Sequence, residues 1–189
     1  MKQSEKIKVW DPLVRLFHWL LLAAFSIAFI TEDDYLSLHT FAGYSVICLL
    51  LFRLAWGFVG PRYARFSDFV YSPTMVMTYL KEIISFKARR YLGHNPAGGV
   101  MIVLLLVSLT FTVLSGVAVY GAGDNAGPLA IWLGHAGETW AEFFEDMHEF
   151  FINFTLLLVF IHIGGVLFES LLLRENLVRA MFSGNKRLD

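Results

Sequence analysis

Six histidines are the residues of this sequence best suited to binding a metal or cofactor, and four of them lie within or at the edges of long apolar stretches: His18, His39, His148 and His162. Ionisable side chains inside an apolar span are costly and are functional candidates by default. Imidazole ligates iron through a ring nitrogen, and it also relays protons. The single cysteine, Cys48, excludes both an internal disulfide and thioether attachment of a haem.

The spacing of these four histidines predicts two pairs at two depths. At 1.5 Å per residue, His18 lies about 8 Å into its helix from one membrane face. His162 follows His148 by 14 residues, or about 21 Å, which places it level with His18 in a hydrocarbon core of about 30 Å. His39 and His148 both begin spans at the opposite face. Because 14 residues make almost four helical turns, His148 and His162 project from nearly the same side of their helix.

Two imidazoles at each of two depths predict two bis-histidine haems within a helical bundle. Without a cysteine pair to attach them, these would be non-covalent b-type haems. The alternative is a set of hydrogen-bonding or proton-relaying histidines, as in a small transporter. Four residues that pair by both depth and face favour haem.

Two arginines share the levels of these histidines. Arg53 lies 14 residues after His39, on the same face, and Arg15 lies three residues before His18. Arginine binds carboxylates with a fork of donors, so both are candidates to anchor haem propionates. The alternative for both is snorkelling toward the lipid headgroups.

Several glycines are also placed to lie beside a flat macrocycle. Gly43 is one turn from His39, and Gly164 and Gly165 follow His162. A missing side chain admits either the ring or a neighbouring helix, because small residues are also typical of ordinary helix contacts in membranes.

The remaining histidines and the cysteine are predicted to have ordinary roles. His94, in the loop 93–96, is predicted to be a solvated turn residue. His135 lies in an outer amphipathic segment and is an alternative ligand at that face. Cys48 is predicted to be a small packing residue.

Four apolar stretches must position these side chains, and each is long enough to cross a bilayer. They are residues 13–30, 38–59, 100–120 and 148–173. With 57% hydrophobic and only 16% charged residues, the composition excludes an ordinary soluble domain. We predict an all-α integral membrane protein, a single domain over 1–189 built as a four-helix bundle. The net charge of −1 excludes a broadly basic nucleic-acid binder.

The charges predict the orientation of the chain. All 15 lysines and arginines lie at the N-terminal end up to the start of the first span, between Arg53 and Arg90, or after Leu173. By the positive-inside rule, both termini and the segment 60–99 are cytoplasmic, with the bacterial inner membrane as the location. The two outer connections hold only acidic charges: Glu32, Asp33, Asp34, Asp124, Glu138, Glu142, Glu145 and Asp146.

Three amphipathic segments are expected outside the spans. One begins with Ser72 as the cap and Pro73 in the first turn, and should lie on the cytoplasmic lipid surface. The second covers 129–147 and leads into the last span, and the third covers 174–182. Four tryptophans are expected at the membrane interfaces: Trp10, Trp56, Trp132 and Trp140.

Taken together, several motifs resemble the bacterial cytochrome b561 family, which includes the b-type cytochrome subunits of nickel hydrogenases. They are VWD (9–11), RLFHW (15–19), RLAWGFVGP (53–61), ARF (64–66), HNP (94–96), RENLVRAM (174–181) and GNK (184–186). The resemblance covers nearly the whole chain and departs mainly in the acidic outer segment 130–146.

The resemblance implies a four-helix core with two b haems ligated by histidines of the first, second and fourth spans, which match the four found above. It also implies a quinone or quinol as the membrane-side redox partner, and an electron-transfer component of a respiratory chain rather than a stand-alone catalyst. Two redox partners at the outer face are compatible with the resemblance: a c-type cytochrome, or a hydrogenase- or formate-dehydrogenase-like enzyme. A third alternative is superoxide–quinone oxidoreduction.

An acidic outer face repels superoxide and attracts a basic protein, which favours a c-type cytochrome. No nucleic-acid partner is expected. Membrane lipid is an expected partner, and a homo-oligomer is compatible with the sequence.

Overall fold

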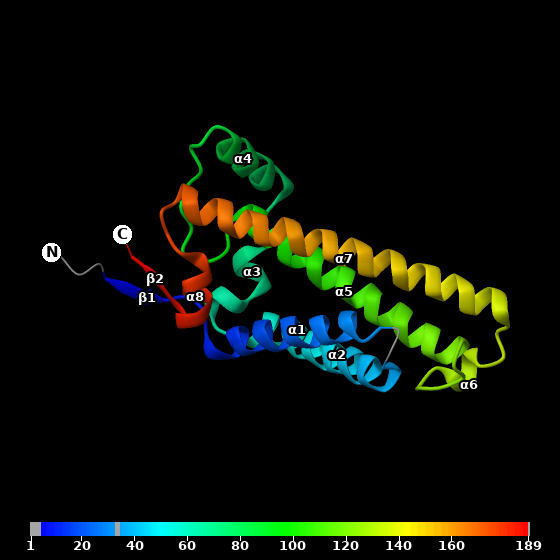
Figure 1. Cartoon of the computed structure of the whole chain (residues 1–189). Helices are drawn as coiled ribbons and strands as arrows, with labels where there is room; N and C mark the ends of the chain where they lie inside the picture. Colours follow the sequence, from blue (N-terminus) through cyan, green and yellow to red (C-terminus); the bar gives the residue numbers. More distant parts are fainter. Residues whose placement is uncertain (1–4, 33–34, 189) are drawn as a thin grey trace. The chain divides into compact units, whose positions relative to one another are not determined.

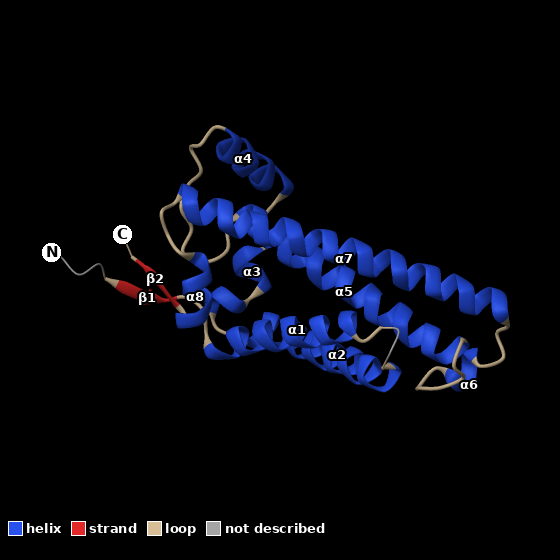
Figure 2. Ribbon diagram, in the orientation of Figure 1, coloured by secondary structure: helices blue, strands red, loops and turns tan. Residues whose placement is uncertain are grey.

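The computed structural model describes residues 5–32 and 35–188, and this part of the chain is mostly helical (Figure 2). Four helices are long and apolar enough to cross a membrane: α1 (Pro12–Ile30), α2 (Leu36–Val59), α5 (Pro96–Ala122) and α7 (Glu138–Leu172). The chain is therefore an all-α, multi-pass membrane protein, as predicted. Asp33 and Asp34, of the predicted acidic connection, lie outside the described residues.

Short elements connect or extend the long helices (Figure 1). They are β1 (Lys6–Lys8), the 3-10 helix η1 (Arg62–Ala64), α3 (Phe66–Phe69), α4 (Pro73–Ile84), α6 (Ala130–Leu133), α8 (Leu177–Ser183) and β2 (Asn185–Arg187).

The predicted helix boundaries were least accurate around the third and fourth spans. The helix α5 begins at Pro96 because the Asn95 side chain caps it, accepting a hydrogen bond from the Gly98 N–H over 2.7 Å. The predicted amphipathic segment 129–147 does lead into the last span from Glu138 onward, but it is not one helix: it is interrupted after α6, and Gly137 adopts a left-handed φ of +86°. The helix α7 is continuous from Glu138 and is about 52 Å long, so it exceeds a hydrocarbon core of about 30 Å.

The chain divides into two compact units. Unit 1 contains residues up to Leu22, Leu51–Val103 and residues from Phe160 onward. Unit 2 contains Ala23–Leu50 and Leu104–Val159. His18 and His162 belong to unit 1, and His39 and His148 belong to unit 2.

In unit 1 an antiparallel pair of strands joins the two ends of the described chain. The strands β1 and β2 pair with Lys6 opposite Arg187. Just before β2, Gly184 ends α8 with a left-handed φ of +82°, and its carbonyl accepts hydrogen bonds from the Val9 and Trp10 N–H groups. These strands were not predicted from the sequence.

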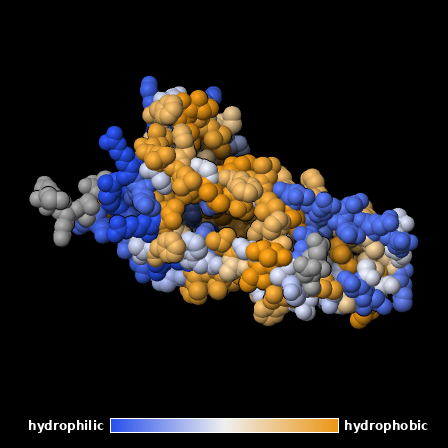
Figure 3. Space-filling model, viewed as in Figure 1, coloured by the Kyte–Doolittle hydropathy of each residue, from blue (hydrophilic) through white to orange (hydrophobic). Residues whose placement is uncertain are grey.

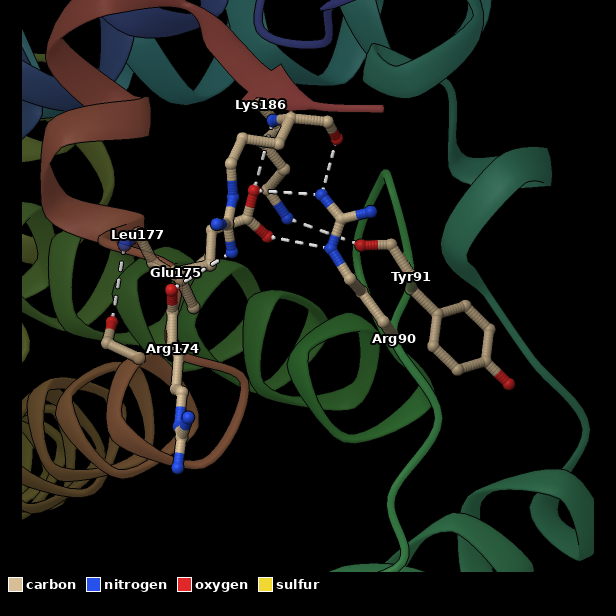
Figure 4. A network of polar contacts seen from close by, with 8 residues as sticks. Arg90, Tyr91, Arg174, Glu175, Leu177 and Lys186 are labelled. Carbon is tan, nitrogen blue, oxygen red and sulfur yellow. Dashed lines mark hydrogen bonds and ion pairs between the residues drawn. The ribbon is translucent and has the colours of Figure 1, made fainter. Parts of the chain in front are cut away.

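A buried polar network fixes the end of α7 against the loop before α5, also in unit 1 (Figure 4). The guanidinium of Arg90 donates two hydrogen bonds to the Glu175 carboxylate, of 3.2 and 2.9 Å. The Arg187 N–H donates to the same carboxylate, and Lys186 Nζ donates to the Tyr91 carbonyl. Burial by itself would raise the pKa of Glu175, but the bonds from Arg90 and Arg187 outweigh it and hold that pKa below its usual value.

The helix α4 confirms the predicted cap. Ser72 Oγ accepts a hydrogen bond from the Met75 N–H, and Pro73 is the first helical residue. Tyr79 is buried, whereas Met77 and Ile84 are exposed. Apolar side chains cover much of the visible surface of the protein (Figure 3), as expected where lipid replaces water.

In unit 2 the helices α5 and α7 pack through small polar residues. The hydroxyls of Ser108 and Thr155 are 2.6 Å apart, and Thr112 Oγ1 lies 3.2 Å from Thr155 Oγ1. Such residues let helices approach closely and satisfy their polar groups where water is absent. Cys48 is exposed, so its predicted packing role was wrong.

Candidate functional site

The imidazoles of His39 on α2 and His148 on α7 lie next to each other in unit 2. Their ring centroids are 6.2 Å apart, and the ring planes are nearly perpendicular, at 84°. Both side chains are half-buried. The depth pairing of these two histidines, inferred from spacing, therefore agrees with the distance between them.

Both rings are held through Nδ1, which leaves Nε2 available as a ligand atom. His39 Nδ1 lies 2.9 Å from the Ala28 carbonyl oxygen, and His148 Nδ1 lies 2.9 Å from the Thr112 carbonyl oxygen. A carbonyl oxygen only accepts, so each Nδ1 carries the proton. His148 Nε2 is buried and has no hydrogen-bond partner among the described residues. Ligand histidines have this arrangement, with one nitrogen oriented by an outer hydrogen bond and the other on the metal.

A cavity adjoins both rings. It is partly open to the outside and has mostly apolar walls from α1, α2, α5 and α7. Cofactor sites are typically clefts of this kind, apolar with a few placed polar groups. Two imidazoles that are held through Nδ1 beside such a cavity fit a b-type haem.

Glycines shape the walls of this cavity. Gly43, predicted to lie beside the macrocycle, lines it and has no atoms within 4 Å of the position of a Cβ. Gly116 also lines it, and a Cβ there would lie only 2.8 Å from His148 Cε1. Sequence reasoning missed Gly116, although the polar pair Ser115–Gly116 within an apolar span was an available signal. Gly165 belongs to unit 1 and also has open space around it.

The second predicted pair, His18 on α1 and His162 on α7, belongs to unit 1. Both side chains are half-buried, and His162 lies within electrostatic range of His18. His18 Nδ1 is buried without a partner in the part of the chain that is described. Both histidines are therefore placed in one unit, separate from His39 and His148.

Arg53 is buried rather than extended toward lipid headgroups, so the snorkelling alternative was wrong for it. Its side chain is only 3% exposed, and its guanidinium carbon lies 5.1 Å from the centre of the Phe66 ring and 5.6 Å from that of Phe69. Arg15 is half-buried and donates a hydrogen bond from Nη1 to the Phe182 carbonyl. Anchoring of propionates by these two arginines stays a prediction.

The prediction of a solvated His94 was wrong. Its ring centroid lies 4.4 Å from that of Trp10 and 4.9 Å from that of Phe69. Burial, with smaller contributions from Lys186 and Arg53, lowers the pKa of His94 to about 3, so the ring is neutral. Trp10, expected at the membrane surface, is only 8% exposed and covers His94 instead.

His135 is exposed and does not line the cavity beside His39 and His148. Its possible use as a ligand in place of one of them has no support in this geometry.

Comparisons with known proteins find relatives over nearly the whole chain. Three relatives share the description "Probable Ni/Fe-hydrogenase B-type cytochrome subunit". The protein from Rhodobacter capsulatus is 24% identical, over 98% of this chain and 83% of its own length. Those from Rhizobium leguminosarum bv. viciae and Cupriavidus necator are 24% and 25% identical, each over 97% of this chain and over 90% and 88% of their own lengths. No solved structure matches the chain.

The family model of the prokaryotic cytochrome b561 proteins matches residues 9–184, almost the whole chain. The chain belongs to the prokaryotic cytochrome b561 family.

Proposed function

We propose that this protein is a dihaem membrane cytochrome that transfers electrons between the quinone pool and a redox partner at the outer face of the bacterial inner membrane. Its family is one of b-type cytochromes, so the cofactor is haem b. The distribution of basic residues supports an orientation with both termini in the cytoplasm.

The observation that carries this proposal is the imidazole pair of unit 2. His39 and His148 would bind one haem through Nε2, while Ala28 and Thr112 hold the Nδ1 protons and thereby the ring orientations. His18 and His162 would bind the second haem in unit 1. When bound, haem b supplies an iron that gains and loses one electron, and the axial ligands and surrounding burial set its potential.

Further residues would complete the two haem sites. Arg53 and Arg15 would bind propionates of the haem in unit 1 through charge-assisted hydrogen bonds. Gly43 in unit 2 and Gly165 in unit 1 would leave space for the macrocycles, because both glycines have open space where a side chain would be.

The test is the haem content of the purified protein and of four single variants. A pyridine haemochrome assay should give two haems b per chain. His39→Ala and His148→Ala should abolish one redox transition, and His18→Ala and His162→Ala should abolish the other. One haem per chain, or loss of the same transition in His18→Ala and His39→Ala, would contradict the proposal.

For the outer partner, the relatives favour an enzyme of the hydrogenase type. Each of the three similar proteins is described as a hydrogenase cytochrome subunit, and the similarity covers nearly the whole of this chain. In this role the protein would be the membrane anchor that connects a periplasmic dehydrogenase to quinone. Co-purification of a metal-containing dehydrogenase from its native membrane, in fixed stoichiometry, is the expected result.

A soluble basic c-type cytochrome is the second candidate, and a second cavity in unit 2 favours it. This cavity adjoins His148 and is lined by three carboxylates, those of Glu32, Glu145 and Glu149. An acidic mouth beside a haem ligand would attract a protein with a basic haem edge and speed its association.

Stopped-flow oxidation of the reduced protein separates the two partners. A c-type cytochrome reaction should slow as salt rises toward about 0.1 M, where the screening length is about 10 Å. It should also slow at low salt when Glu142, Glu145 and Asp146 are replaced by neutral residues. A rate that responds to neither change would favour the fixed enzyme subunit.

A further inference from the structure

Arg53 places a permanent positive charge in the interior of unit 1. Its side chain is 3% exposed, and its Nη1 has no hydrogen-bond partner among residues 5–32 and 35–188. Within the same residues no carboxylate pairs with it in a salt bridge. The rings of Phe66 and Phe69 offset only part of the cost of burying a guanidinium. Asp11 lies within electrostatic range of the guanidinium but forms no salt bridge with it, so Nη1 is left without an acceptor among the described residues and is suited to an added anion.

His94 presents a second unsatisfied polar atom in the same unit. Its Nδ1 is buried and has no partner in the described part of the chain. The His94 ring and the Arg53 guanidinium both contact Phe69, which is fully buried. A buried polar nitrogen without a hydrogen bond destabilises the folded chain, because its lost contact with water is not replaced. Two such atoms beside one aromatic ring indicate a common ligand.

We propose that Arg53 and His94 together bind one propionate carboxylate of the haem held in unit 1. Arg53 supplies the positive charge, and His94 supplies a neutral N–H donor. The ligand is a carboxylate rather than an apolar group, because the Arg53 guanidinium needs an acceptor, and His94 donates to the same group in the tautomer that carries its proton on Nδ1. This inference rests on the proposed haem between His18 and His162, and it makes His94 a positioning residue for that haem.

The loop that carries His94 is rigid enough to act in this way. The Tyr71 hydroxyl donates a 3.0 Å hydrogen bond to the His94 carbonyl, and the following Asn95 caps α5. The Trp10 ring packs against the imidazole, with the two ring centroids 4.4 Å apart. The imidazole is thus fixed before a carboxylate arrives, which lowers the entropy lost on binding.

The experiment compares haem b with its dimethyl ester, in which neither propionate carries a charge. The full-length protein is stripped of haem in detergent, reconstituted with each compound, and mixed with excess apomyoglobin to measure the rate of haem loss. Haem loss from the wild-type protein should occur in two kinetic phases, and the phase that disappears in His18→Ala is the one that reports the haem of unit 1. His94→Phe and Arg53→Leu should each accelerate that phase about 10- to 100-fold for haem b, and neither should accelerate it for the ester.

Three further measurements complete the design. His94→Gln keeps an N–H donor and should restore much of the retention. The double variant His94→Phe/Arg53→Leu should lose haem b faster than wild type, but by a factor smaller than the product of the two single accelerations, because both residues bind one group. The exposed His135 and Arg179 serve as matched controls, and His135→Phe and Arg179→Leu should release haem b at the wild-type rate.

The possible failures are distinguishable. If His94→Phe accelerated the loss of haem b and of its ester equally, His94 would have a packing role and the inference would be overturned. An unchanged rate of haem b loss in this variant would overturn it as well. Either result would leave the two-haem function intact. A wild-type protein that binds no haem in unit 1 would instead refute the proposed function itself.

Discussion

Replacing Gly116 by alanine should selectively weaken the haem held by His39 and His148. The new methyl carbon would lie 2.8 Å from His148 Cε1 and 3.2 Å from Nδ1, whereas ordinary contacts begin at 3.4 Å. The ring must therefore move by at least about 0.6 Å. Because its Nδ1 is fixed by a 2.9 Å hydrogen bond to the Thr112 carbonyl on the same helix as Gly116, that bond is lost or distorted.

Loss of an outer hydrogen bond to a ligand histidine typically lowers metal affinity 10- to 100-fold. We expect an effect of this size on the retention of the haem of unit 2. The substitution should not destabilise the helix α5 itself, since alanine is favoured over glycine in helices by about 1 kcal/mol. Reduced haem content with unchanged helical circular dichroism is the expected combination.

The assay is a redox titration of the purified variant together with its haem content. Gly164→Ala is the matched control, because a Cβ at Gly164 meets no atom within 4 Å. This control should keep the transition that depends on His39 and His148. Full occupancy and an unshifted potential of that transition in Gly116→Ala would refute the assignment of His148 as a ligand held by Thr112.

Three further substitutions test the surroundings of the sites. Gly99→Ala places a methyl group against the Phe69 carbonyl oxygen, a backbone atom that cannot move freely. Thermal unfolding should show a loss of stability of about 1–3 kcal/mol. Glu175→Gln should remove one step from the acid denaturation profile. The pKa of Glu175 in the folded protein lies below its ordinary value of 4.5. The ionised carboxylate therefore adds to the free energy of unfolding above pH 4.5, and this stabilisation is lost as the pH falls through the pKa of the folded state. Ser72→Ala should lower the stability of α4 by about 1 kcal/mol, measured as faster hydrogen exchange in that helix alone.

The long helices could be predicted from the sequence because their signal is local. Twenty apolar residues in succession specify a membrane helix whatever surrounds them, and Ser72 followed by Pro73 specifies a helix start. The pairing of His39 with His148 could also be inferred, because helix rise converts residue number into depth. These features depend on spacing within one segment.

The features that sequence reasoning missed depend on contacts between distant segments. His94 is buried only because Trp10 and Phe69 close over it, and no local pattern encodes that. The strand β1 has three residues with lysine on either side of Ile7, too short and too polar to show a strand pattern. Gly116 acquires its importance only once His148 of another helix packs against it.

The division of the chain into two units has a consequence for biosynthesis. The last residue of unit 2 is Val159, whereas unit 1 needs β2, at residues 185–187, to pair with β1. Because a chain is made from its N-terminus, the residues of unit 2 are complete before those of unit 1. Unit 1 needs nearly thirty further residues. A chain cut shortly after α7 would therefore contain every residue of unit 2, including His39 and His148, but would lack the partner strand of β1.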